Sequence, residues 1–240
     1  AIVAYLLLAV ISIMAVVARL TVGGWSLHGA SLWIAGVGMA LVLPLFWLIT
    51  ATPSPGAGDN LNATAMTIKL AEYFASRRHS GEALQHTRLI LLSADGEEVG
   101  QRGAAAYAER HRPELLAVPT YILNVDAVYR LDDLAVTTRD RNNTLALSAR
   151  LAKECSRLAA ELGYPIKEIA LPTGGTDAGP FARAGLDATT FVGISTALFN
   201  RGRVYHTLDD TVEHIEPAAV ETVLDIAVNY VLRKEDENRG

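Results

Sequence analysis

The chain has 240 residues, half of them hydrophobic, and a formal net charge of −5 at pH 7. An acidic chain without a basic stripe lacks the phosphate contacts that nucleic acids require, so we expect no nucleic acid partner. The charges are unevenly distributed, because residues 1–50 contain one charged side chain, Arg19, and all 26 acids follow them. The sequence therefore predicts two domains in different surroundings, residues 1–51 and residues 52–240.

Two apolar runs, residues 1–18 and 30–51, are each about long enough to cross a bilayer core of ~30 Å. Trp33 and Trp47 lie near the two ends of the second run, where interfacial aromatic residues are common. A cleaved signal peptide would have one short apolar run, and a buried hairpin of a soluble core would show polar residues at helical spacing. We therefore expect a two-helix transmembrane hairpin in a multi-pass membrane protein, with the lipid bilayer as a partner.

The short segment between the apolar runs would return the chain to its starting side of the membrane. Its positive charge is Arg19, and positive charge favours the cytoplasmic side. This favours a cytoplasmic loop and an extracytoplasmic large domain.

The large domain alternates helix-like and strand-like segments. We expect helices over residues 62–78, 102–111, 144–162, 177–185 and 217–234. We expect strands over residues 87–95, 119–128, 131–140, 167–172 and 187–195. This alternation predicts an α/β fold, a three-layer sandwich with a mixed, largely parallel central sheet flanked by helices.

Several acids and one histidine fall where predicted strands or loops end. Glu97 and Glu98 follow the first predicted strand, and Asp126 lies near the end of the second. Asp59 lies in a glycine-rich loop before a helix, and His206 lies in a loop after a strand. Ligands of open α/β sheets bind outside the carboxyl ends of strands. Grouped carboxylates repel unless a cation is shared between them, so the pattern favours a divalent metal such as zinc, manganese or cobalt.

Each of these residues also has an ordinary structural explanation. Alone, Asp126 would cap a strand end, and the pair Glu97 and Glu98 would form a solvated turn. A serine hydrolase is not expected, because Ser93 and Ser195 lack the glycines of a nucleophile elbow. Only the combination of the acids with the histidine points to a site.

The segments that carry these residues resemble a known family. "SPGAGDN", "SADGEEVG", "NVDAV", "GGTDAGPFARAG" and "YHTLDDT" occur in this order and look like the co-catalytic di-zinc aminopeptidases, metallopeptidase family twenty-eight. The resemblance covers nearly all of residues 53–232. It implies a metal-dependent exopeptidase that hydrolyses N-terminal bonds of peptide substrates with two zinc ions.

The resemblance also assigns roles to individual residues. Asp59 would bridge the two metals, Glu98 and His206 would complete one metal site, and Asp126 would serve the other. Glu97 would be the general base that takes a proton from the metal-bound water and returns it to the departing amine.

Three further residues match family positions around the metals. Asp210 would belong to the surroundings of the metal site and orient an imidazole. Asp177 and Tyr205 would face the substrate.

One family feature is missing from the sequence. The family has a histidine ligand in a His-x-Asp motif on a strand upstream of the bridging aspartate, whereas only a loop and the two apolar runs precede Asp59 here. His28, the histidine in that region, would lie across the membrane. Either the chain is an N-terminally truncated fragment that lacks the first strands and holds one or two ions, or it is a degenerate relative that acts as a membrane-bound binding or scaffold protein. The retained acids and His206 favour the enzyme, which we expect to need the upstream histidine for activity.

Overall fold

The computed structural model describes residues 9–14, 17, 36–38, 40, 52–164, 166–194 and 204–239. The chain divides into two compact units, Ala1–Pro53 and Ser54–Gly240. In the first unit, residues 9–14, 17, 36–38 and 40 are helical, and the predicted membrane hairpin lies largely outside the described residues. Within the described residues, no helix is both long enough and apolar enough to cross a bilayer.

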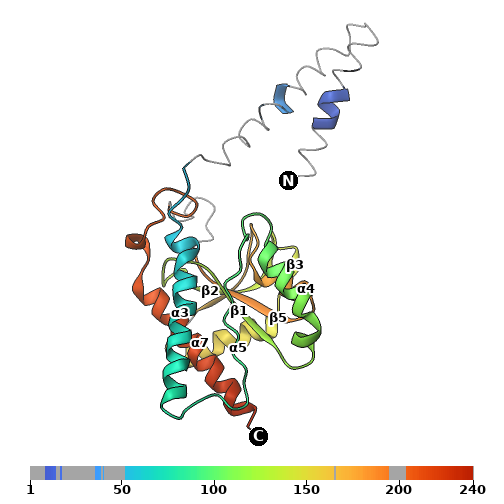
Figure 1. Cartoon of the computed structure of the whole chain (residues 1–240). Coiled ribbons are helices and arrows are strands. Elements are labelled where there is room, and N and C mark those ends of the chain that lie inside the picture. The colour runs from blue at the N-terminus through green and yellow to red at the C-terminus, as the bar shows by residue number, and fades with distance from the viewer. Residues whose placement is uncertain are drawn as a thin grey trace. The chain divides into compact units, whose positions relative to one another are not determined.

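The second unit alternates helices and strands, as its sequence predicts (Figure 1). The helices are α3 (Asn62–His79), α4 (Arg102–Leu116), α5 (Ala149–Glu161), α6 (Ala178–Arg183) and α7 (Pro217–Glu237). Two short helical turns are η2 (Ala57–Leu61) and η3 (Val212–His214). The strands are β1 (Tyr121–Val128), β2 (Ala135–Asp140), β3 (Leu145–Ala146), β4 (Lys167–Ala170) and β5 (Asp187–Gly193).

The strands form one mixed sheet in the order β1-β5-β2-β3, with β4 paired to β2. β1 and β5 are parallel from the pair Tyr121 and Asp187 onward, and β2 and β4 are also parallel. β2 runs antiparallel to β5 and to β3. β5 is buried along almost its whole length, which is typical of a strand covered on both faces.

Helices cover both faces of this sheet. On one face α3, α5 and α7 pack in a core that includes Leu151, Phe191 and Val223. On the other face α4 and α6 pack in a core that includes Ala108 and Phe181. The predicted three-layer α/β sandwich is confirmed.

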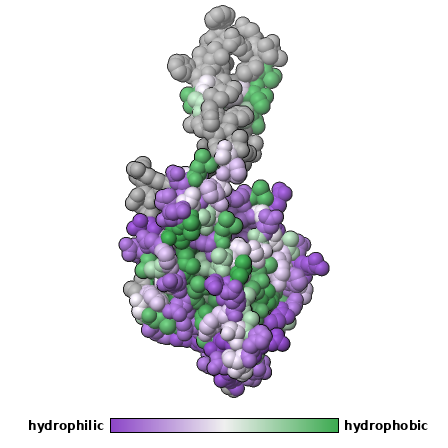
Figure 2. All heavy atoms as spheres, turned by 60° about the vertical axis from the view of Figure 1, so that its left-hand side comes forward, coloured by the Kyte–Doolittle hydropathy of each residue, from purple (hydrophilic) through white to green (hydrophobic). Residues whose placement is uncertain are grey.

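The predicted strand 87–95 is wrong. These residues form no strand, and the backbone of residues 88–94 makes no hydrogen bond to the rest of the described chain. Ile90, Leu91 and Leu92 are exposed by 40%, 36% and 38%. Figure 2 shows apolar residues at the surface among polar ones on the face of this unit that it presents. A β-prone sequence needs a neighbouring strand to become a strand, and none lies beside this segment in the described chain.

The predicted helix 144–162 starts later than its sequence suggests. Leu145 and Ala146 pair with β2 as β3, and α5 begins at Ala149. Ser148 is the N-cap, because its hydroxyl accepts a hydrogen bond from the backbone N–H of Leu151 at 3.2 Å.

Replacement of Leu151 by Ala tests the core beneath α5. Leu151 is 0% exposed, so the variant should lose about 2–5 kcal/mol of the free energy of unfolding. Leu116→Ala is the control, because Leu116 is 44% exposed and should lose less than about 1 kcal/mol. Urea unfolding followed by circular dichroism measures both, and equal losses would contradict the described core.

Candidate metal centre

Three side chains with metal-binding groups meet at one point. His206 Nε2 lies 3.0 Å from Asp59 Oδ2 and 3.2 Å from Glu98 Oε1. One ligand atom from each of the three residues lies within 4.8 Å of the others. The fold therefore gathers two carboxylates and an imidazole that the sequence places on three separate segments.

Each of the three residues is held by local backbone structure. Asp59 belongs to η2 but departs from helical geometry, with φ −123° and ψ 85°, directly before α3 begins. Glu98 lies in the turn that leads into α4, where the N–H groups of Gly100 and Gln101 donate to the carbonyl of Glu97 at 2.9 and 2.8 Å. His206 has a φ of +59°, a backbone conformation that non-glycine residues adopt mainly where the surrounding structure imposes it.

The spacing of these three groups fits a zinc ion. Zinc bonds oxygen and imidazole nitrogen at about 2.0–2.2 Å, which places the ligand atoms of a tetrahedral site roughly 3.4 Å apart. The two distances from His206 Nε2 are close to that value. One ring nitrogen carries at most one hydrogen and cannot donate fully to both carboxylates, whereas a cation among the three contacts them all. Asp59, Glu98 and His206 are therefore suited to hold zinc.

The charges of the two carboxylates act strongly on the imidazole. Hydrogen bonds with Asp59, and next with Glu98, raise the pKa of His206 from 6.5 to about 10. The same contact with His206 lowers the pKa of Glu98. The pair of acids thus selects a positive partner, either a proton on the imidazole or a metal ion.

Glu97 lies beside this centre as a partly buried carboxylate. Gln101 Nε2 donates to Glu97 Oε1 at 3.4 Å. Burial, and next the charge of Glu98, raises the pKa of Glu97 to about 7, and Asp177 and Asp59 add to this effect. Glu97 can therefore accept and release a proton near neutral pH.

Asp126 lies on β1 at an irregularity of the sheet. The register between β1 and β5 shifts between Asp126 and Val128, and Ala127 has a φ of +49°. Such a bulge changes the direction of a neighbouring side chain. Asp126 does not join the three clustered ligands within the described chain. Burial, and next the charges of Asp59 and Glu97, raises the pKa of Asp126 well above its usual value.

Asp177 and Tyr205 lie around the same group of acids. Asp177 precedes α6, and its buried Oδ1 has no hydrogen bond within the described chain. Burial, and next Asp140, raises the pKa of Asp177 to about 6. The Tyr205 ring stacks on the imidazole of His206 with centroids 3.9 Å apart.

The carboxylate of Asp210 contacts backbone rather than an imidazole. It accepts hydrogen bonds from Gly58 N at 2.7 Å and Asp59 N at 3.1 Å. Asp210, which the family resemblance predicts to orient an imidazole, is therefore bonded to the turn that carries Asp59.

Sequence reasoning missed three residues of this region. Gln101 contacts Glu97, and no motif in the sequence marks it. Gly58 is packed against Tyr129, since a Cβ on Gly58 would lie 2.0 Å from a carbon of the Tyr129 ring. The repeated glycines before Asp59 were a signal for such a close approach, but the partner ring could not be found without the fold.

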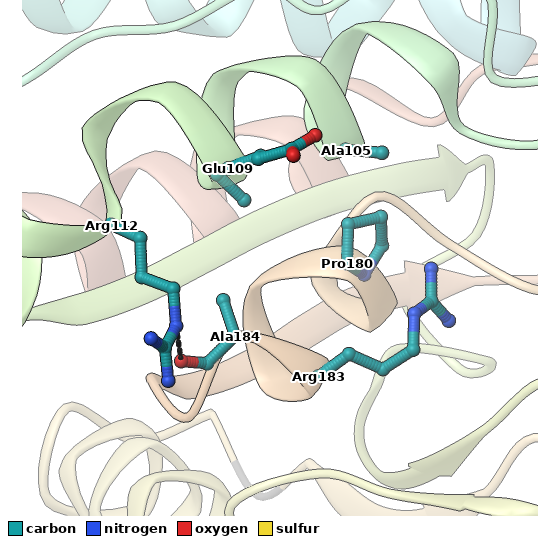
Figure 3. Close-up of a pocket in the computed structure, with 7 residues that line it drawn as sticks. Ala105, Glu109, Arg112, Pro180, Arg183 and Ala184 are labelled. Carbon is teal, nitrogen blue, oxygen red and sulfur yellow. Dashed lines mark hydrogen bonds between the residues drawn. The ribbon is translucent and has the colours of Figure 1, made fainter.

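A shallow groove between α4 and α6 lies apart from these residues (Figure 3). Its lining includes Glu109, Pro180 and Arg183, and Arg112 Nε donates to the carbonyl of Ala184 at 2.9 Å. It contains none of the candidate metal ligands, so we assign the site to the acids at the end of β1.

Comparison with known sequences identifies related proteins. The profile of Peptidase family M28 matches residues 44–231. Aminopeptidase YwaD of Bacillus subtilis (strain 168) is 29% identical over 191 residues, which are 76% of this chain and 39% of that protein.

Solved structures share the fold. BSAP, a zinc aminopeptidase from Bacillus subtilis, is 24% identical with a TM-score of 0.56, over 72% of this chain and 41% of that one. The LapA aminopeptidase of Legionella pneumophila is 17% identical with a TM-score of 0.58, over 74% of this chain and 47% of that one. The chain spans about two fifths of the length of the curated relative and of the Bacillus structure.

The titration of His206 tests the electrostatics of the centre. In protein stripped of metal with a chelator, the imidazole should titrate near pH 10 instead of 6.5, which NMR of the ring protons measures. Protonated His206 then stabilises the metal-free fold below about pH 6.5, and this contribution is lost as the pH rises through about 10. His206→Gln assigns the resonance and should remove that part of the pH dependence. A midpoint near 6.5 would contradict the described contacts.

Proposed function

Because this chain belongs to Peptidase family M28, we propose that it is part of a membrane-anchored, zinc-dependent aminopeptidase-type exopeptidase that hydrolyses N-terminal bonds of peptides. The observation that carries the proposal is the convergence of Asp59, Glu98 and His206 on a point where one zinc ion fits. Glu97, with a pKa near 7, lies next to one of these ligands in the chain. A metal ligand set beside a titratable carboxylate is suited to hydrolysis.

The residues of the chain have distinct roles in this proposal. Bound zinc supplies a Lewis acid that polarises a carbonyl and lowers the pKa of water. Glu97 is the general base, and its partly buried carboxylate can move a proton from the attacking water to the departing amine near neutral pH. Burial, and next the charge of Asp59, raises the pKa of Tyr205, so its hydroxyl keeps a proton with which to bind a substrate oxygen. Asp177 faces the substrate.

A second zinc ion belongs to the same proposal. Asp126 interacts electrostatically with Asp59, Glu97 and Asp177, and its raised pKa reflects the surplus of negative charge. Asp126 and Asp59 would hold a second cation, which would neutralise that surplus. The full-length protein would then hold two ions, and this chain by itself one or two.

We propose that the second ion needs a histidine from a further strand. Two observations support an additional strand next to β1. β1 has one strand neighbour in the described sheet, β5, and the backbone of residues 88–94 has no partner in the described chain. Asp126 lies near the end of β1, and Glu97 and Glu98 follow residues 88–94 in the chain. A strand between these two segments can therefore place a ligand at the same end of the sheet.

Isosteric changes at two adjacent acids test the assigned chemistry. Glu97→Gln in the full-length protein, purified in detergent with zinc, should lower the kcat for an amino-acid anilide by about 10²–10⁴-fold and retain the metal. Glu98→Gln is the matched variant, and it should instead lose zinc affinity because a ligand oxygen is removed. Release of the chromophore and metal content per chain measure the two effects.

Normal turnover of Glu97→Gln would reject the assigned base. A wild-type protein that binds zinc but never cleaves peptides or anilides would favour the membrane-bound binding or scaffold role.

Membrane anchoring by residues 1–51 is tested by fractionation. The two apolar runs predict that the full chain stays in the membrane pellet after alkaline carbonate extraction and is released by detergent. A chain that begins at Ser54, where the second compact unit starts, should move to the supernatant. Protease added to intact cells then tests the extracytoplasmic position of the large domain, and a full chain that carbonate extracts would contradict the anchor.

A further inference from the structure

Asp210 binds three successive backbone N–H groups in the turn that carries Asp59. Its Oδ1 accepts from Gly58 N at 2.7 Å, and its Oδ2 accepts from Asp59 N at 3.1 Å. Its backbone carbonyl accepts from Ala57 N at 3.1 Å. Asp59 and Asp210 are 151 residues apart in the sequence, so one residue fastens two distant segments together.

These N–H groups lack a partner within their own turn. The first N–H groups of a helical turn have no acceptor inside it and are usually satisfied by the N-cap side chain. The N-cap of η2 is Gly56, in a left-handed conformation with φ 67°, and it has no side chain to cap with. Asp210 therefore caps η2 from another part of the chain.

The Asp210 carboxylate is fully buried, with an exposure of 0%. A buried carboxylate is costly unless hydrogen bonds compensate for lost water, and the two N–H groups provide such bonds. The two hydrogen bonds also restrict the conformation of the turn, because each carboxylate oxygen of Asp210 accepts one of them. The Tyr129 ring also restricts the turn, because a Cβ on Gly58 would clash with it.

Asp210 lies four residues after His206 in the same loop. Within that loop, Asp210 N donates to the carbonyl of Thr207 at 3.3 Å. Ser54 Oγ donates to that same carbonyl at 2.8 Å, which adds a second link between the two segments. A shift at Asp210 would therefore change the position of Asp59 relative to His206, the pair whose ligand atoms lie 3.0 Å apart.

We propose that Asp210 is a positioning residue that sets the distance between Asp59 and His206, and thereby the zinc affinity of the centre. This inference rests on the zinc site of the proposed function and adds a residue that touches neither the metal nor the substrate. It assigns the side chain to a backbone turn, in place of the imidazole that the sequence favoured.

Asp210→Asn tests the inference. The carboxamide keeps one acceptor oxygen, but its NH₂ group then faces a backbone N–H, so one hydrogen bond is lost. Zinc affinity should fall about 10–100-fold, measured by competition with a chromophoric chelator. The absorption bands of bound Co²⁺ should also shift, because the ligand geometry changes.

Asp140→Asn is the matched control. Asp140 is 1% exposed and likewise accepts backbone hydrogen bonds, from Arg141 N at 2.5 Å and from Thr176 N at 3.1 Å. It has no described contact with Asp59 or His206. Both variants should be less stable in thermal unfolding without metal, but Asp140→Asn should change zinc affinity and the Co²⁺ bands far less than Asp210→Asn, because Asp140 acts on the site only through the charges of Asp126 and Asp177.

Wild-type zinc affinity in Asp210→Asn, or an equal loss in Asp140→Asn, would overturn the inference. If Asp210→Asn does not fold, Ser54→Ala replaces it, because it removes an exposed link between the same segments together with the local bond from Gly56 N to Ser54 Oγ. We then expect weaker zinc binding, and unchanged binding would likewise overturn the inference. Failure of the wild-type chain to bind zinc would instead reject the metal site itself.

Discussion

Asp59 and Glu98 can lie next to each other only because a positive charge sits between them. Two carboxylates at this separation repel, and the contact of both with His206 Nε2 shows where the compensating charge belongs. The raised pKa of His206 shows that the two carboxylates stabilise a positive charge at this point. A proton on His206 Nε2 provides one N–H, which cannot bond fully to both carboxylates. A zinc ion can contact all three groups, so the same geometry favours the metal.

Other acids near these three residues also lack a compensating positive charge. Burial is the largest cause of the raised pKa of Glu97, Asp126 and Asp177, and the charges of neighbouring acids add to it. These acids surround one region at the end of β1, where they must hold protons or share cations. A carboxylate with a pKa near 7 is suited to moving protons, so the surplus of acids that would destabilise an ordinary surface suits the hydrolysis that we propose.

The sheet explains why this region can hold such a site. β1 and β5 run parallel, and a bulge at Asp126 alters the side-chain direction where β1 ends. The ligands themselves lie on turns, since Asp59 precedes α3, Glu98 precedes α4 and His206 lies in a loop. Hydrogen bonds within the Glu98 turn hold that ligand, and the bonds of Asp210 to the Asp59 turn join the segments that carry Asp59 and His206.

The sequence by itself determined the α/β class, the alternation of elements and the identity of the acids and the histidine. Buried strands and amphipathic helices are local patterns, and the ordered motifs mark Asp59, Glu98 and His206 without any coordinates. Only the tertiary structure decided which atoms meet, because distances between segments depend on packing that no local pattern encodes. It also decided that Asp210 bonds to backbone, that Tyr129 requires a glycine at Gly58, and that residues 88–94 are not a strand, because a strand exists only where a neighbour accepts its hydrogen bonds.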